Sequence, residues 1–344
     1  MTTAPDTAPG DQAGDPPAIT VIVLNFNAGA YLTACVEALA AQNFKNFRAI
    51  IADNGSTDTS FEEARSRIDD PRFSFVEFGV NHGFARGNNL AAESVETPLV
   101  VLLNPDAIPE PDWLTELEKA ERAFPKAGSF GSLQLDLNDR AQLDGAGDNY
   151  LALGVPWRGG HGHSAGASPP KGDVFSACAA AAMYRTDLFR AAGGFDEDYF
   201  CYVEDVDLGF RLRLRGGGCR HVPDAIVAHA GGVSSGSRRS EFAVYHGIRN
   251  MIWTFVKNMP GPLFVLLAPG HVLILVVLLT KAILRGEGAC VYRAIRDAVC
   301  GLGAILGKRR KVQAARVATN ADIASAMVWN VLAYFRKDAV IRER

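Results

Sequence analysis

Cysteine is scarce in this sequence, with six among 344 residues, and no two of them form a C-x-x-C pair. The cysteines also show no regular spacing, so we expect reduced thiols, packed as small apolar groups in a cytosolic compartment. An excess of positive charge is also lacking, because the net charge is −3. We therefore expect no nucleic-acid partner bound through bulk electrostatic attraction.

An uninterrupted long hydrophobic run is absent as well. Residues 1–17 are rich in Pro, Asp, Ala, Thr and Gly without an apolar core, so we expect a disordered tail rather than a signal peptide. Residues 262–284 form the most hydrophobic stretch, but Pro269, Gly270 and His271 interrupt it. The unbroken part is too short to cross the ~30 Å hydrocarbon layer of a bilayer.

The region 258–344 is expected to be helical, and two interpretations of 262–284 stay open. The segment could lie as a hairpin or helix in a membrane surface, or it could form a buried or dimer contact between copies of the chain. The basic cluster 308–311 would suit an anionic cytoplasmic leaflet, although a solvated helix end would carry the same charges.

What the chain does hold is a repeat of strand, polar turn and helix. Apolar, β-branched runs predict four strands, at 19–24, 47–52, 73–78 and 99–103. Helical periodicity follows at 31–42 and 109–124. This alternation predicts an α/β fold with a mostly parallel sheet, helices on both faces and a Rossmann-like nucleotide-binding half.

The second half of this region is less regular. Residues 138–172 are rich in Gly, His, Asp and Pro and predict a long functional loop. The other expected elements are a strand at 128–137, a buried strand at 173–184, a strand pair at 219–222 and 225–228, and a helix at 241–257.

Polar residues follow the predicted strands, at Asn25, Asp53 and Asp106 and in the loop Asn81–Asn89. Ligands of open α/β sheets bind beyond the carboxyl ends of the strands, so these residues are expected to converge. Asp53 begins Asp-Asn-Gly-Ser-Thr-Asp58 and could accept a hydrogen bond from the N3–H of a pyrimidine. The alternative is a simple Asx turn in which Asp58 caps the next helix.

Two further motifs could serve a diphosphate. Within Asn81–Asn89, Arg86 is a candidate cation and Asn88 and Asn89 are candidate hydrogen-bonding side chains; the alternative is a polar turn, and no Gly-rich phosphate motif occurs there. In Asn104-Pro-Asp106, one carboxylate with diphosphate oxygens could hold Mg²⁺ or Mn²⁺, unless it only precedes a helix.

The stretch Gly194–Arg211 is dense in acids and aromatics. Spacings of three and four place Val203, Val206, Phe210 and Leu214 on one helical stripe, with Glu204, Asp207, Arg211 and Arg215 on a polar side. Asp205 points away from the apolar stripe in the first turn. These acids could merely complement the helix dipole, and Asp196 and Asp198 in the preceding loop are expected to be structural or acceptor-side.

Together these motifs resemble inverting family 2 glycosyltransferases of the GT-A fold, most of all the rhamnosyltransferase-like branch, over residues 18–257. The resemblance implies a nucleotide-sugar donor, a divalent metal and one-step displacement at the anomeric carbon. It assigns the general base to Asp205 and the metal to Asp106, with His229 as a metal or phosphate contact. The residues implied in donor binding are Asn25, Asp53, Asn54, Asp58, Arg86, Asn88, Asn89 and Asn104. Those implied as acceptor-side or supporting groups are Glu204, Asp207, Arg249 and Asn250.

The motifs depart from the family pattern in two places. Asn-Pro-Asp106 replaces Asp-x-Asp, so metal binding depends on one carboxylate. No Gln-x-x-Arg-Trp occurs, which argues against a processive polysaccharide synthase.

The expected function is transfer of a deoxyhexose such as rhamnose from a dTDP- or UDP-linked donor. The expected acceptor is a hydroxyl of a glycan or lipid-linked glycan, at the cytoplasmic face of a membrane. One alternative is a membrane-anchored binding protein built on an inactive transferase domain. Another is a nucleotidyltransferase, but that class wants a cation in a Gly-rich loop after the first strand, and Asn25–Gly29 has none.

Overall fold

A computed structural model describes residues 16–166, 169–231 and 240–343, so nearly all of the predicted tail 1–17 lies outside the described residues. The strands are β1 (Ile19–Asn25), β2 (Phe47–Asp53), β3 (Phe73–Glu77), β4 (Leu99–Leu103), β5 (Ala107–Pro109), β6 (Ala127–Asp136), β7 (Leu143–Gly145), β8 (Asp148–Leu151), β9 (Val155–Arg158), β10 (Gly172–Val174), β11 (Ala181–Arg185) and β12 (Gly218–His229). The helices are α1 (Ala30–Ala40), α2 (Ser60–Arg67), α3 (Gly83–Ala92), α4 (Trp113–Ala123), α5 (Thr186–Ala191), α6 (Glu204–Leu214), α7 (Glu241–Asn258), α8 (Gly261–Leu284), α9 (Gly288–Cys300), α10 (Leu302–Ala314), α11 (Asn320–Ala326) and α12 (Val331–Arg336).

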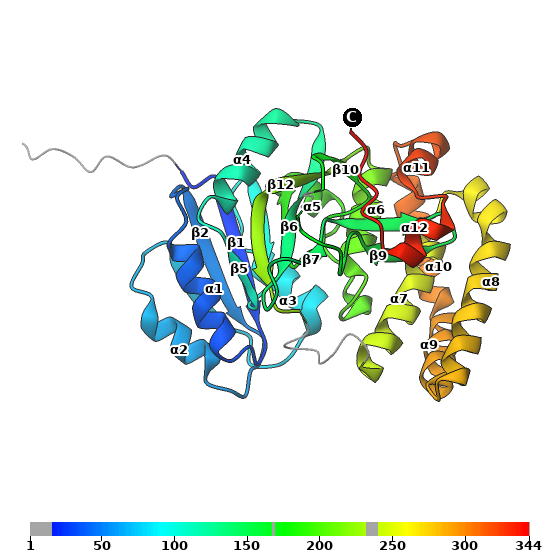
Figure 1. The fold of residues 1–344 in the computed structure, drawn as a ribbon, viewed down its shortest axis with the longest axis horizontal. Helices are drawn as coiled ribbons and strands as arrows, with labels where there is room; N and C mark the ends of the chain where they lie inside the picture. Colours follow the sequence, from blue (N-terminus) through cyan, green and yellow to red (C-terminus); the bar gives the residue numbers. More distant parts are fainter. Residues whose placement is uncertain (1–15, 167–168, 232–239, 344) are drawn as a thin grey trace, which may run out of the picture.

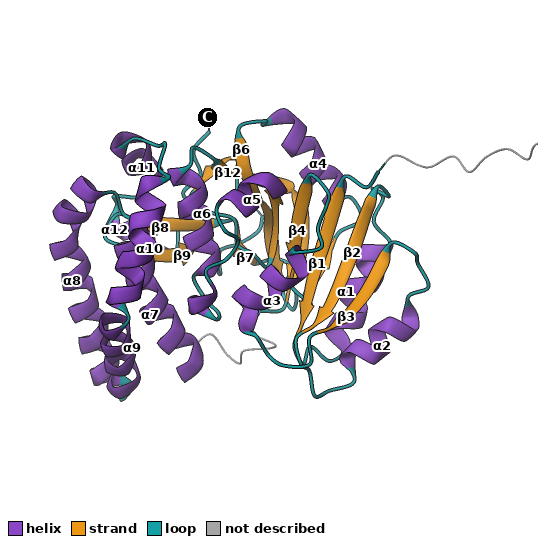
Figure 2. Cartoon of the chain, turned by 180° about the vertical axis from the view of Figure 1, so that it is seen from behind, coloured by secondary structure: helices purple, strands orange, loops and turns teal. Residues whose placement is uncertain are grey.

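A ten-stranded sheet forms the centre of the molecule, in the order β10-β12-β6-β11-β4-β1-β2-β3 (Figure 1). The two remaining strands pair outside this order, β5 with β12 and β7 with β6. β1 pairs in parallel with both β2 and β4, and all seven of its residues are buried. Helices α1, α2 and α4 cover one face, and α3, α5 and α6 cover the other (Figure 2). The predicted α/β class, with a mostly parallel sheet between helices, is confirmed.

The region after β6 corrects three predictions. The predicted strand 173–184 is two strands, because the chain leaves the sheet edge at β10 and re-enters as β11, antiparallel between β4 and β6. The predicted pair 219–222 and 225–228 is one strand, β12, with a register shift beside Pro223, which has no N–H to donate. The predicted loop 138–172 contains the short strands β7, β8 and β9.

The helix predicted at 109–124 begins only at Trp113. The preceding residues, Ala107–Pro109, form β5 and pair with the end of β12, so that Ala107 lies opposite His229. This pairing brings the segment after β4 next to a histidine more than a hundred residues later in the chain.

The C-terminal helices α7 to α12 pack beside α6 and the β8–β9 hairpin, away from the β3 edge of the sheet (Figures 1 and 2). The interruption predicted within 262–284 is wrong, because α8 is one helix of 24 residues with Pro269 inside it. Leu267 and His271 are buried on either side of Pro269, and this packing keeps the helix continuous. By length and composition α8 is the one helix in the described ranges that could cross a membrane.

Candidate active site

The ends of β1 and β2 bring Asn25 and Asp53 together, as predicted from their positions after the strands. The two residues are register partners, and Asn25 Nδ2 donates to Asp53 Oδ1 at 2.9 Å. The other carboxylate oxygen of Asp53 accepts the backbone N–H groups of Gly55 and Ser56 at 3.1 and 2.9 Å. The Asx turn is therefore real, and it fixes the carboxylate at the carboxyl edge of the sheet.

The remaining residues of this turn link three loops. Asn54 donates to Asn81 Oδ1 and to the Gly83 carbonyl. Asp58 accepts the N–H of Gly29 at 3.0 Å, and it accepts the N–H and the hydroxyl of Ser60 at 3.2 and 2.6 Å. Burial opposes ionisation of Asp58, but these hydrogen bonds, led by that of the Ser60 side chain, lower its pKa.

The side chains of α3 have different surroundings. Asn88 Nδ2 donates to the Phe84 carbonyl within the helix. Asn89 bonds both the N–H and the carbonyl of Phe195, so it holds the loop before α6. Arg86 is half exposed, and its guanidinium lies 4.0 Å from Glu197. The donor-binding roles of these three residues stay predictions.

Asp106 and His229 meet in space, although sequence alone left this open. His229 Nε2 lies 3.3 Å from both Asp106 Oδ1 and Asn104 Nδ2, and its Nδ1 lies 2.8 Å from Asp144 Oδ2. Burial alone would lower the pKa of His229, but hydrogen bonds and charge from Asp106 and Asp144 raise it. The buried histidine is thus held between two carboxylates.

This group fits a small divalent cation. Two neighbouring ligands that each lie about 2.1 Å from Mg²⁺ are about 3 Å apart, close to the separation of Asp106 Oδ1 and His229 Nε2. The Nδ1 contact with Asp144 matches the way a metal-ligating imidazole is oriented by a carboxylate behind it. Asp106 and His229 would hold such an ion, and Asp144 would orient the imidazole.

A cavity of about 320 Å³ lies between this group and the start of α6. Its polar lining includes Asn104, Asp148, Arg158, Cys178, Glu204, Asp205 and His229, and its aromatic lining comes from Phe84, Trp157 and Tyr202. The predicted base and the predicted metal contact thus face one cavity.

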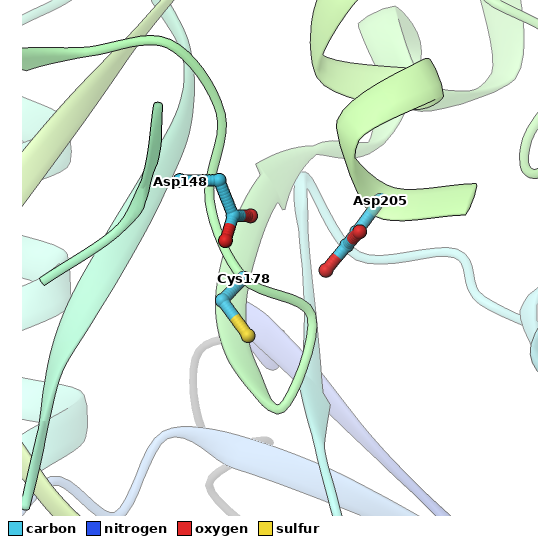
Figure 3. Close-up of side chains that lie close together, drawn as sticks. All are labelled: Asp148, Cys178 and Asp205. Carbon is cyan, nitrogen blue, oxygen red and sulfur yellow. The ribbon is translucent and has the colours of Figure 1, made fainter. Parts of the chain in front are cut away.

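Asp205 lies in the first turn of α6 and is partly exposed to this cavity. Its Oδ2 accepts the N–H of Ala179 at 3.1 Å. Figure 3 shows its side chain facing those of Asp148 and Cys178, and one ligand atom of each lies within 4.8 Å of the others. Burial raises the pKa of Asp205, and burial together with the charge of Asp205 raises that of Asp148. The charge of Asp205 therefore disfavours ionisation of Asp148.

The other acids of the α6 region differ from the prediction in their environment. Glu204 is buried, and its Oε2 has no hydrogen-bond partner among the described residues; burial and the charge of Asp205 raise its pKa. Asp207 and Arg211 do not form an exposed polar side, because both are buried as an ion pair of 2.8 Å. α7 covers this pair and brings Lys257 to within 2.8 Å of Asp207.

The loop before α6 is held in a strained conformation. Phe200, Tyr202 and Val203 all have φ between 63° and 69°, which non-glycine residues rarely adopt. Asn250 donates to the carbonyls of Tyr199, Cys201 and Tyr202 at 2.7–3.0 Å.

Arg249 contacts the same loop. Its guanidinium donates to the carbonyls of Asp198 and Tyr199, at 2.9 and 3.1 Å. In this structure Arg249 and Asn250 therefore support the loop that leads to Asp205.

Sequence reasoning missed Asp144, Asp148, Arg158 and Cys178. Arg158 forms an ion pair with Asp144, which contacts His229, and its guanidinium donates at 3.0 Å to Sγ of Cys178, which lies beside Asp148 and Asp205. The two acids frame Asp144-Gly-Ala-Gly-Asp148, inside the stretch predicted as a functional loop. Two acids separated by small residues in a long loop were the sequence signal that could have identified Asp144 and Asp148 as candidate site residues.

Comparisons with known proteins agree with this geometry. Residues 20–193, half of the chain, match the family model described as Glycosyl transferase family 2. An N-acetylglucosaminyl-diphospho-decaprenol L-rhamnosyltransferase of Mycobacterium tuberculosis is 28% identical over 254 residues, covering 66% of this chain and 81% of the relative. An N-acetylglucosaminyltransferase of Sinorhizobium fredii is also 28% identical, over 66% of this chain and 56% of its own.

Solved structures share the fold. The mannosyltransferase PcManGT from Pyrobaculum calidifontis aligns over 93% of this chain and 87% of its own, with a TM-score of 0.54 and 16% identity. S. aureus TarS residues 1–349 align over 71% of this chain and 68% of theirs, with a TM-score of 0.51 and 15% identity. The family match, the rhamnosyltransferase-like relative and the shared fold lead to one conclusion: this chain belongs to glycosyl transferase family 2 and is a glycosyltransferase.

Proposed function

We propose that this enzyme is an inverting, non-processive transferase that moves a deoxyhexose, such as rhamnose, from a dTDP- or UDP-linked donor. The proposed acceptor is a hydroxyl of a glycan or lipid-linked glycan. The similarity to a rhamnosyltransferase whose name specifies a diphospho-decaprenol-linked sugar supports this choice. The proposed location is the cytoplasmic face of a membrane, where such lipid-linked acceptors would be presented.

One observation carries the proposal: Asp205 faces the same cavity as Asn104 and His229. An acceptor hydroxyl beside Asp205 and a sugar diphosphate beside His229 would thus be brought together. Proximity of this kind removes much of the entropic cost of a two-substrate reaction.

Asp205 acts as the general base in the proposed mechanism. Its carboxylate takes the proton from the acceptor hydroxyl while that oxygen forms a bond to the anomeric carbon. The bond from this carbon to the diphosphate oxygen breaks, and its electron pair stays on the leaving nucleoside diphosphate. Burial raises the pKa of Asp205, which makes the carboxylate a better proton acceptor near neutral pH.

The diphosphate needs neutralising charge as it leaves. A divalent metal, Mg²⁺ or Mn²⁺, held by Asp106 and His229, would supply it as a Lewis acid. The fold neighbour PcManGT was solved with GDP-Man and Mn²⁺, which supports a metal of this kind. Asn104 lies beside His229 at the same cavity wall.

The proposed donor site begins at the turn after β2. Asp53 would accept a hydrogen bond from the pyrimidine base, and Asn25, Asn54 and Asp58 fix this turn through the contacts described above. Arg86, at the start of α3, would approach the diphosphate together with Asn88 and Asn89.

Asp205→Asn tests the base, and Asp148→Asn is its matched control in the same cavity. We expect Asp205→Asn to lower turnover by about 10²–10⁴-fold while nucleotide-sugar binding persists. Asp148→Asn should keep most of the turnover, because Asp148 is not assigned proton transfer. Near-normal turnover of Asp205→Asn would refute the assignment.

A donor screen tests the sugar. Hydrolysis and transfer would be measured for UDP-, dTDP- and GDP-linked sugars, and we expect dTDP-rhamnose to be used best. Exclusive use of another donor would refute the deoxyhexose proposal and leave the Asp205 assignment standing.

A further inference from the structure

The outer face of α8 is an apolar surface that no described residue covers. Its exposed large side chains recur at helical spacing over 20 residues, and their exposed fractions run from 40 to 81%. We call this set the α8 stripe: Val265, Leu266, Val272, Leu273, Val276, Val277, Ile283 and Leu284. Among the residues from Pro262 to Thr280, no charged side chain interrupts it.

The α8 stripe is larger than monomeric proteins usually leave exposed. Eight side chains at these exposures present an area on the order of 700 Å², against about 300–600 Å² for the largest apolar patch of a typical monomer. Helix α12 extends it, because Lys281 on α8 lies 5.3 Å from the ring of Phe335, and Leu332 and Phe335 are exposed. A surface of this size requires an apolar partner.

The inner face of α8 fixes the helix against the protein along its length. Leu267 joins the core formed with α7, His271 bonds the Leu153 carbonyl at 2.8 Å, and Ala282 is buried near the other end. α9 runs back beside α8 and packs on α7. Because α9 carries Arg293, Arg296 and Asp297, α8 cannot cross a bilayer without drawing charges into it.

Charge selects the partner. Segments 261–286 and 331–337 contain Lys281, Arg285, Arg336 and Lys337 and no acid; the first acids follow at 287 and 338. Phe335 directly precedes Arg336 and Lys337, and the exposed Trp329 lies just before this segment; aromatic residues of this kind are enriched at membrane interfaces. A second copy of this surface would offer the four cations only the flanking acids Glu287 and Asp338, whereas an anionic lipid surface would pair with all of them.

We infer that α8 and α12 dock the enzyme on an anionic lipid bilayer, with α8 lying in the plane of the membrane and its stripe among the acyl chains. This membrane attachment rests on the proposed function only in that both place the enzyme at a membrane. The identity of the sugar and of the acceptor does not affect it. Basic residues 308–311 contribute less than their sequence indicates, because Lys308 binds Asp196 and Asp198 while Arg309 donates to the carbonyls of Val256 and Met259 at the end of α7.

Vesicle co-sedimentation of the full chain tests the surface. Leu273→Glu/Val276→Glu places two charges on the stripe, and Val76→Glu/Val80→Glu is the matched control, because these valines are also exposed, by 41 and 58%, near the β3 edge. Figure 2 shows β3 and α8 at opposite ends of the molecule.

We expect the wild-type chain and the control to bind vesicles of phosphatidylcholine with phosphatidylglycerol, and to bind phosphatidylcholine alone more weakly. The stripe variant should bind at least about tenfold more weakly than the control, since carboxylates oppose entry into the apolar layer. Equal binding of the two variants overturns the proposal. So does a wild-type dimer that ignores vesicles and dissociates in the stripe variant. Donor hydrolysis in detergent reports the proposed function separately.

Spin labels measure the orientation of the helix. Cysteines introduced by Val265→Cys, Val276→Cys and Leu284→Cys, in a Cys300→Ser background, would be labelled on the vesicle-bound chain. Equal, shallow immersion at the three sites supports the in-plane position. Immersion that is deepest at 276, with the two ends on opposite sides of the bilayer, overturns it.

Discussion

Lys257 is the most informative residue to change outside the cavity, because this lysine, with 1% of its side chain exposed, links the loop and helix that carry the proposed base to the C-terminal helices. Its ammonium lies 2.5 Å from Asp196 Oδ2, in the loop before α6, and 2.8 Å from Asp207 Oδ1, within α6. Lys257→Met keeps the length and packing of the side chain but leaves these carboxylates with one cation fewer.

The magnitude follows from the burial of the group. Removing one partner of a buried ion pair costs about 3–5 kcal/mol, because the remaining charge stays desolvated. Asp207 keeps Arg211 and Asp196 keeps Lys308, so we expect the lower end of that range. For a chain of 344 residues, a loss of about 3 kcal/mol corresponds to a fall in Tm of roughly 4 °C.

Lys308→Met is the matched control, since Lys308 binds Asp196 and Asp198 but is 35% exposed. A half-exposed pair contributes about 0–1 kcal/mol after screening, so its Tm should fall by roughly 2 °C or less. Thermal unfolding followed by circular dichroism would compare both variants with the wild type. An equal, small fall in Tm in both variants would refute the claim that the buried ion pairs of Lys257 stabilise the fold more than the half-exposed pairs of Lys308.

Further predictions concern pH, the loop and the donor turn. Burial opposes ionisation of Asp207, but Arg211 and then Lys257 lower its pKa from 3.8 to about 2. This contributes about 2 kcal/mol of stability above pH ~4, lost as pH falls toward 2, and Lys257→Met should move the loss to higher pH in acid unfolding. Asn250→Ala removes three hydrogen bonds to the strained loop, so it should lower kcat, measured by steady-state kinetics, more than donor affinity, measured by calorimetry. A change in donor affinity alone would contradict this supporting role of Asn250. Gly55→Ala should weaken nucleotide binding by at least about tenfold, because φ is +77° and a Cβ would lie 2.6 Å from the Val80 backbone. Gly29→Ala shares the backbone strain, with φ at +56°, but its Cβ meets no atom within 4 Å, so this variant should bind nucleotide more tightly than Gly55→Ala.

Much of the first half of the fold was predictable because its signals are local. Strands such as 19–24 and 99–103 are short apolar runs bounded by polar turns, and parallel strands place their carboxyl ends at one edge of a sheet. That rule predicted the convergence of Asn25 with Asp53, which the structure confirms with a direct hydrogen bond.

The second half was predicted less well, because its elements depend on distant partners. The apolar residues of 173–184 look like one strand, yet β10 and β11 pair at different places in the sheet. α8 stays helical through Pro269 because buried neighbours hold it on both sides, and these neighbours cannot be deduced from a run of apolar residues.

The sequence by itself determined the kind of chemistry: acids after strands, an acidic first turn at 204–207 and a histidine after β12. Tertiary structure decided which of them act together. Folding buries Asp207 against Lys257, and it uses the Asn250 side chain to bind backbone carbonyls of the loop before α6. It also brings Asp144 and Asp148 to the cavity region, from a stretch whose sequence shows no periodicity. The physical reason is that a carboxylate's environment is set by charges and donors far away in the chain, which only folding brings within a few ångströms.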